Sequence, residues 1–426
     1  MSDRPNDITP PLRGAIENDP RVVLLDVAAE VGVAAIRGQL LVHEAELSSA
    51  GFASELRAVA EQVAVRHTDE PAPELKQTPH AHADVGLWQL KKDENLVEVI
   101  RRLRDQGIRP GRAHVSPNHL LVPCPPHWCP AVAPSPTSET IEIPSFDCEP
   151  VVDVVVIDAG WVDVPLLAAR GGIDVVTPSS ALSAAAAGMA VGGAGVLPAI
   201  SGHATFIVGE IAAQCSNARF LVVNHPDPWV DEWSVAASLA RWAGAQCDRV
   251  PDVVSCGFAM ATLDNRPSFA FGNALGQLAA TTAVVSPAGN QASTLPHWPA
   301  AFKRVVGVGA FDETNGNAMA SFSNHGPWVD CAAGGVGVVS TFIKGTWTPQ
   351  DADPQVPVDF GDFASWSGTS FSTPRFTAAV AARLAKARAN HAATNGRRVA
   401  HKLAAGLVPE LVLGSDLDLG TKLDLP

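Results

Sequence analysis

The chain has 426 residues, enough for two or three domains and at least one large hydrophobic core. Hydrophobic residues make up 46% of it and charged residues 17%, which is typical of a well-folded globular protein. The net charge of −14 argues against nucleic acid or an anionic membrane as a main partner.

The beginning of the chain and its cysteines bear on location. The first twenty residues lack a basic stretch followed by an apolar one, so we expect no secretory signal and a cytoplasmic location. Seven scattered cysteines, an odd number, fit a reducing compartment better than a disulfide framework. Residues 181–200 are uncharged and long enough to span a membrane, but they consist mainly of Ala and Gly. We therefore expect close-packed structure there and no membrane contact.

Residues 1–124 are expected to form a small α+β domain. Residues 38–43, 85–90 and 118–123 have the pattern of strands, whereas 52–65 and 95–105 have helical spacing. Two His and one Asp within residues 80–84 lack a second group of metal ligands, so we expect a solvated loop there.

A proline-rich linker over residues 125–150 is expected to be extended. Around its start, Cys124, His127 and Cys129 offer three zinc-ligand types within six residues, but no fourth ligand is near. We expect no metal there.

Residues 151–390 are predicted to form a parallel α/β domain, followed by a C-terminal extension over 391–426. Short apolar runs at 151–157, 250–254 and 283–286 each end in small polar residues, and helical patterns separate them. This alternation predicts a parallel sheet flanked by helices on both faces. The polar groups should lie at the carboxyl edge of the sheet, where open α/β folds bind ligands.

Four residues in this domain supply the groups needed for catalysis by a hydroxyl nucleophile. Ser370, in a Gly-Thr-Ser sequence before a run of small apolar residues, is expected to be an accessible hydroxyl in the first turn of a buried helix. His203 offers a base, Asp158 a carboxylate to orient it, and Asn290 an amide donor for an oxyanion. Each residue alone is more often a cap, a turn residue or a buried side chain, but together they occur in the Asp, His, Ser order of subtilisin.

Residues 152–384 resemble the subtilisin-like serine peptidases. The similarity rests on four segments, residues 155–160, 202–209, 286–290 and 367–374, which are similar to the family's Asp, His, oxyanion and Ser motifs. The resemblance implies a serine endopeptidase with Asp158, His203 and Ser370 as the triad and Asn290 in the oxyanion hole.

The same resemblance implies where substrate binds. The strand Ser255-Cys256-Gly257 is similar to the one that lies along an extended peptide, and Gly289 and Gln291 flank Asn290. The neutral amide of Gln291 predicts no strong demand for a basic residue in the first specificity pocket. Calcium is common in the family, but no compact acidic loop is visible here, so we expect no required cofactor.

One departure keeps a second function open. The family usually has glycine after the catalytic histidine, where this chain has Ala204. An inactive scaffold that binds peptides is therefore the alternative to an active peptidase. A sedolisin-type acid peptidase would replace His203 and Asn290 with acids, and an α/β-hydrolase would need a second glycine after Ser370. For the active peptidase and for the inactive scaffold alike, the expected partner is a protein or peptide. Residues 1–124 are expected to contact the peptidase domain.

Overall fold

The computed structural model describes residues 20–25, 33–64, 85–109, 113–123, 134–178, 201–225, 230–245, 247, 249–347 and 356–406. Within these ranges no helix is long and apolar enough to cross a membrane. The expectations for residues 80–84, 124–129 and 181–200 and for most of the C-terminal extension lie outside the described residues. Five of the cysteines are described, and none of the five forms a disulfide in the part of the chain that the structure describes.

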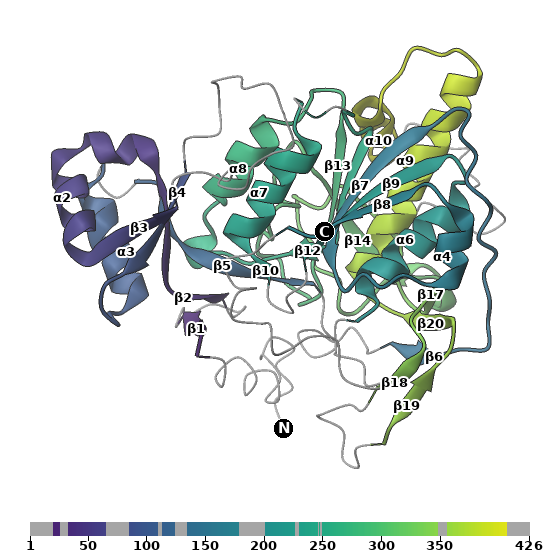
Figure 1. Ribbon diagram of the computed structural model, residues 1–426, viewed down its shortest axis with the longest axis horizontal. Helices are drawn as coiled ribbons and strands as arrows, with labels where there is room; N and C mark the ends of the chain where they lie inside the picture. Colours follow the sequence, from purple (N-terminus) through teal and green to yellow (C-terminus); the bar gives the residue numbers. More distant parts are fainter. Residues whose placement is uncertain are drawn as a thin grey trace.

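The centre of the molecule is a mainly parallel sheet with strand order β15-β14-β13-β11-β7-β9-β8 and with β16 beside β14 (Figure 1). Only β15 pairs antiparallel to its neighbour. The strands are β7 (Val152–Ala159), β8 (Ile173–Val176), β9 (Ala218–His225), β11 (Val253–Cys256), β13 (Ala283–Pro287), β14 (Val306–Asp312), β15 (Ala318–Met319) and β16 (Cys331–Gly334). The predicted α/β class is confirmed.

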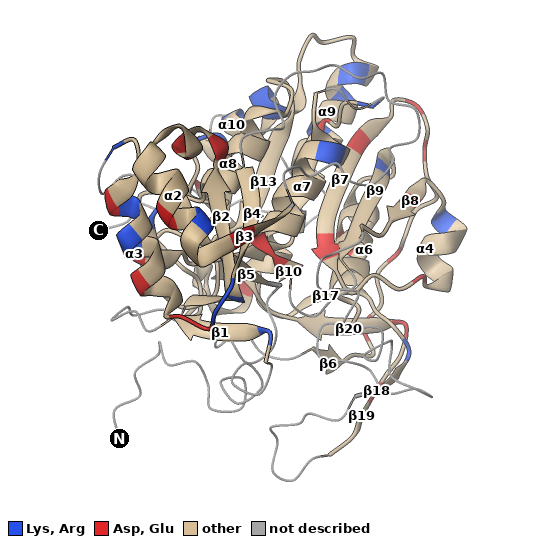
Figure 2. Cartoon of the chain, turned by 60° about the vertical axis from the view of Figure 1, so that its left-hand side comes forward, with Lys and Arg blue, Asp and Glu red and all other residues tan. Residues whose placement is uncertain are grey.

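Helices cover both faces of this sheet, because its central strand is apolar on both sides. In β7, Val154 and Val156 point into one core, and Val155 and Ile157 point into the other. The first core is covered by α4 (Pro165–Arg170), α6 (His203–Gln214), α9 (Thr369–Ala389) and α10 (Gly396–Ala404), and the second by α7 (Glu232–Ala243) and α8 (Phe269–Gly276). In Figure 2 the charged residues lie mostly on helices and at strand ends, which leaves the middle of the sheet apolar.

The N-terminal part forms a second sheet with two helices on its outer face. Its elements are β1 (Val22–Leu25), β2 (Val33–His43), α2 (Ala50–Val59), β3 (Ala60–Ala64), β4 (Val85–Leu90), α3 (Leu96–Gln106) and β5 (Val115–Pro123). The single helix predicted over residues 52–65 is wrong in its second half. Residues from Ala60 onward pair with β4, and this tertiary pairing overrides the helical preference of Glu61 and Gln62.

This N-terminal sheet is joined to the rest of the chain through β5. Strand β5 pairs antiparallel with β10 (Val230–Asp231) and with β12 (Phe258–Ala259), which directly follows β11. The sheet's inner face also packs on α7 and α8, because Leu41, Leu87 and Leu121 belong to the same core as those helices. Figure 1 shows β5 running from the N-terminal helices to the foot of α7. The boundary proposed at residue 124 stays a prediction.

Two small sheets complete the described fold. Strand β20 lies between β17 and β6, and β18 pairs with β19 in a hairpin. Their bounds are β6 (Ser135–Pro136), β17 (Val338–Thr341), β18 (Gly345–Trp347), β19 (Val358–Phe360) and β20 (Phe363–Trp366). One residue, Ser367, separates Trp366 at the end of β20 from the Gly-Thr-Ser sequence at the start of α9.

Candidate active site

The structure brings Asp158 and His203 together at the carboxyl edge of the large sheet. Asp158 is next to last in β7, and His203 is the first residue of α6. The imidazole Nδ1 lies 2.8 Å from Oδ2 and 3.0 Å from Oδ1 of the carboxylate. The preceding Gly202 has φ of +84°, and a Cβ there would lie 2.6 Å from the Phe342 ring, so the turn that aims His203 requires glycine.

The other nitrogen of the imidazole is available for chemistry. His203 Nε2 is buried and has no hydrogen-bond partner among the described residues. The rings of Trp366 and Phe371 pack against the imidazole, each with its centroid 5.5 Å away. Asp158 therefore orients one nitrogen while aromatic packing shields the ring from water.

Ser370 is the second residue of α9, as the sequence predicted. A backbone N–H in the first turn of a helix has no partner within the helix, so the N–H of Ser370 can serve as an anion donor. The hydroxyl donates to the Gly257 carbonyl oxygen at 3.5 Å, and no hydrogen bond joins it to His203 in the described residues. Only 2% of Ser370 is exposed, so the expectation of an accessible hydroxyl is wrong for this conformation.

Asn290 is held in place by the residue that precedes Ser370. Its Oδ1 accepts from the N–H of Thr369 at 2.8 Å and from the Thr369 hydroxyl at 2.7 Å. The same hydroxyl oxygen accepts from the N–H of Gly289 at 3.1 Å. With its oxygen fixed by Thr369, the amide of Asn290 is oriented with its nitrogen as the donor end, close to Gly368.

The role of Thr369 was missed by sequence reasoning. The residue lies in the motif around Ser370, but nothing in the sequence indicates that it bonds to Asn290, 79 residues earlier. A second missed residue is the buried Asn324, whose Oδ1 accepts from the N–H groups of Gln291 and Ser293 and whose Nδ2 donates to the Ala288 carbonyl. Asn324 thus holds the loop that carries Asn290.

The residues predicted along the substrate differ in what they can contact. Ser255 lies between β7 and β13, so its backbone already pairs on both sides. Gly257 lies so close to Asp158 that a Cβ at this position would be 2.4 Å from the carboxylate. The Gln291 side chain turns back, and its Oε1 accepts from its neighbour Asn290 N–H at 2.9 Å. From Phe258 onward the chain leaves the large sheet and pairs with β5.

Neither a second nucleophile nor a metal site accompanies this arrangement in the described residues. Burial, reinforced by the charge of Asp158, raises the pKa of the Cys256 thiol to about 12, so this thiol stays protonated. Among the residues that the structure describes, no three His, Cys, Asp or Glu side chains are grouped to hold a metal ion.

A carboxylate-imidazole pair at the edge of a parallel sheet, beside a serine at a helix start, is typical of the class of serine hydrolases on an α/β fold. Residues 191–404, just over half of the chain, match the sequence profile of the subtilase family. The chain belongs to the subtilase family.

Similar proteins include proteases. The chain is 30% identical over 206 residues to a thermophilic serine proteinase of Bacillus sp. (strain AK1). The matched region covers 45% of this chain and 44% of that protein. It is 35% identical over 102 residues to thermitase of Thermoactinomyces vulgaris, which is 24% of this chain and 30% of thermitase. The matched region therefore spans less than half of the length of these relatives.

A solved structure is also similar. Fervidolysin from Fervidobacterium pennivorans, a keratinolytic enzyme related to subtilisin, matches 83% of this chain and 55% of its own, with 20% identity and a TM-score of 0.49.

Proposed function

We propose that the chain is a serine endopeptidase in which Ser370 attacks a peptide carbonyl. His203 Nε2 takes the hydroxyl proton and then delivers it to the leaving amine, while Asp158 holds the tautomer and stabilises the imidazolium. The Asn290 amide and the Ser370 N–H stabilise the tetrahedral oxyanion. No metal or other cofactor enters these steps, and we propose a cytoplasmic setting for them.

The observation that carries this proposal is the contact of both Asp158 oxygens with His203 Nδ1, since it leaves Nε2 as the proton acceptor. Ala204, which kept the scaffold alternative open, is fully buried in the first core and does not displace the start of α6 at His203. The lack of a hydrogen bond from Ser370 to His203 in the described residues does not weigh against catalysis, because such hydrogen bonds are often long without substrate.

Labelling with a fluorophosphonate probe tests this function. We expect the native chain and Ser372→Ala to be labelled, and Ser370→Ala to remain unlabelled. Ser372 is a suitable control because it is a buried hydroxyl in the same helical turn, bonded to the Thr369 carbonyl. No labelling of the native chain would favour the peptide-binding scaffold, and labelling that survives in Ser370→Ala would show that Ser370 is not the nucleophile.

We also propose that residues 1–124 restrain the peptidase in cis. An extended substrate would add to the strand edge that continues from Gly257, and at Phe258 and Ala259 that edge is paired with Val122 and Pro123 of β5. Because the N-terminal part is tethered, even weak docking keeps this edge covered. The competing view is that this part recruits another protein and leaves the cleft free.

A further inference from the structure

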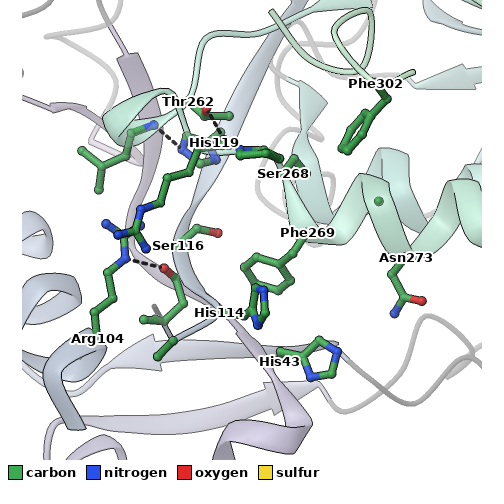
Figure 3. Close-up of a pocket in the computed structure, with 16 residues that line it drawn as sticks. His43, Arg104, His114, Ser116, His119, Thr262, Ser268, Phe269, Asn273 and Phe302 are labelled. Carbon is green, nitrogen blue, oxygen red and sulfur yellow. Dashed lines mark hydrogen bonds between the residues drawn. The ribbon is translucent and has the colours of Figure 1, made fainter. Parts of the chain in front are cut away.

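A cavity of about 520 Å³ lies between the N-terminal sheet and the segment before α8, away from Asp158 and Ser370. Its lining comes from both parts of the chain. The N-terminal part contributes Arg104 and Ser116, and the peptidase part contributes Arg266, Phe269 and Phe302 (Figure 3). The volume is in the range of sites for small organic ligands.

The charge of the lining is one-sided. Arg104, Arg266 and three histidines line the cavity, and none of the described lining residues is Asp or Glu. This is unusual for a chain with 44 acidic and 30 basic residues. Burial lowers the pKa of Arg104 most, and the nearby charge of Arg266 lowers it further, whereas the hydrogen bond to Asp264 raises it. An anion that reached both guanidinium groups would offset the remaining repulsion between them.

Donors are available at the base of the cavity. Arg104 uses Nε for the Val115 carbonyl and Nη1 for the Asp264 carboxylate, and its Nη2 donates to no described residue. The Ser116 hydroxyl is buried and has no partner in the described residues, although a buried polar group normally has one. In Figure 3 the Ser116 side chain points into the space between Arg104 and Phe269.

The opposite wall is apolar and aromatic. Phe269 packs against the rings of His43 and His114, with centroids 6.5 Å and 5.9 Å away. Phe302 lies on the same side of the cavity in Figure 3. The ring or short hydrocarbon chain of a ligand would fit against this wall. A charged group at the end of that ligand could then reach Arg104 and Arg266.

We propose that this cavity binds a small organic anion, with its carboxylate or phosphate against Arg104 and Arg266 and its apolar part against Phe269 and Phe302. Since both parts of the chain line the site, the ligand binds only when the N-terminal part is docked, and it therefore stabilises the docked arrangement by mass action. The inference depends on that docking and not on peptidase activity.

Calorimetric titration of the full chain carrying Ser370→Ala tests the site without self-digestion. The probes are 3-phenylpropionate, phenyl phosphate, the neutral 3-phenylpropionamide and inorganic phosphate. We expect at least one of the two organic anions to bind one site at least about tenfold tighter than the amide, because hydrogen bonds to charged groups are the stronger ones. The organic anion that binds more tightly shows whether the site prefers a carboxylate or a phosphate. The same anion should also raise the unfolding temperature of the chain.

Two substitutions in the same background check the location. Arg266→Gln should weaken the tighter anion about tenfold, and because Arg266 is exposed the change does not threaten the fold. Arg57→Gln, an exposed arginine on α2 outside the cavity, should leave the affinity unchanged. The proposal would be overturned if the amide or inorganic phosphate bound as tightly as the organic anions. It would also be overturned if Arg266→Gln bound the tighter anion with native affinity, or if no probe bound at millimolar concentration.

Discussion

Arg375 of α9 donates a buried hydrogen bond from Nε to Oε1 of Glu210 in α6, at 3.1 Å, and so joins the helix that carries Ser370 to the helix that begins with His203. Burial raises the pKa of the Glu210 carboxyl to about 8 even though Arg375 lowers it, and the second carboxyl oxygen has no partner in the described residues. Glu210 therefore keeps its proton at neutral pH in the folded chain.

This protonation predicts how stability depends on pH. In the unfolded chain a glutamate ionises above about pH 4.3, whereas folded Glu210 stays protonated up to about pH 8. The native chain should thus lose stability as the pH rises from about 5 to about 8, relative to Glu210→Gln. Urea unfolding of both chains across this window measures the difference.

A second carboxylate on the same arginine provides the control for that experiment. Glu313 contacts Arg375 Nη1 at 2.8 Å and is partly exposed. Glu313 makes the smallest contribution to the raised pKa of Glu210, so the variant Glu313→Gln should keep most of the native pH dependence. If the free energy of unfolding changes with pH in the same way in the native chain and in Glu210→Gln, Glu210 is ionised in the folded state and the prediction is wrong.

Ser370→Ala should abolish peptide hydrolysis while leaving the fold intact. The hydroxyl makes one weak contact, to the Gly257 carbonyl, so its removal costs little stability. The expected loss in kcat is on the order of 10⁶-fold, the figure for the catalytic serine of subtilisin. Casein hydrolysis measured beside the thermal unfolding curve checks both parts, and substantial remaining turnover would rule out Ser370 as the nucleophile.

Substitutions of Asn290 separate its two contacts. Asn290→Ala removes the oxyanion donor and the acceptor for Thr369, whereas Asn290→Asp keeps an acceptor for Thr369 and replaces the donor with a carboxylate oxygen. Both variants should lower kcat by about 10² to 10³ with little change in KM, in line with the subtilisin example. If Asn290→Asp keeps native kcat, the residue serves only to hold Thr369.

The sequence was sufficient to predict features that depend on local pattern. The parallel sheet followed from apolar runs such as residues 151–157, and the strand ends placed Asp158 and Asn290 at one edge of it. What it could not predict depends on contacts between distant segments. The strand at Ala60 forms because β4 lies beside it, and the burial of Ser370 depends on packing that no local pattern records.

Two buried histidines predict loss of stability in acid. Burial lowers the pKa of His225 and of His297 to about 4, whereas a histidine in the unfolded chain protonates below about pH 6.5. The unfolded chain therefore binds more protons between these values, and stability falls as the pH drops through that window.

The variant His297→Phe tests this prediction. A phenyl ring at this position keeps the stacking on Trp328 and removes a buried nitrogen that has no partner in the described residues. Between pH 7.5 and pH 4.5, the free energy of unfolding measured in urea should therefore fall less in His297→Phe than in the native chain. The exposed His401→Gln should behave like the native chain. An equal loss in all three chains would contradict a neutral, buried His297.

The last prediction concerns the restraint by residues 1–124, and it uses a contact between β5 and the start of α7. Asn118 of β5 donates to Asp231 Oδ1 at 3.0 Å and accepts from the N–H of Trp233 at 3.0 Å. Asn118→Ala removes both of these buried hydrogen bonds, which together contribute about 1–3 kcal/mol of docking free energy. If docking covers the strand edge at Phe258, casein hydrolysis by the full chain should rise by about tenfold. Gln106→Ala, an exposed change on α3, should leave the rate as it is. An unchanged rate in a folded Asn118→Ala chain would mean that the N-terminal part leaves the cleft free.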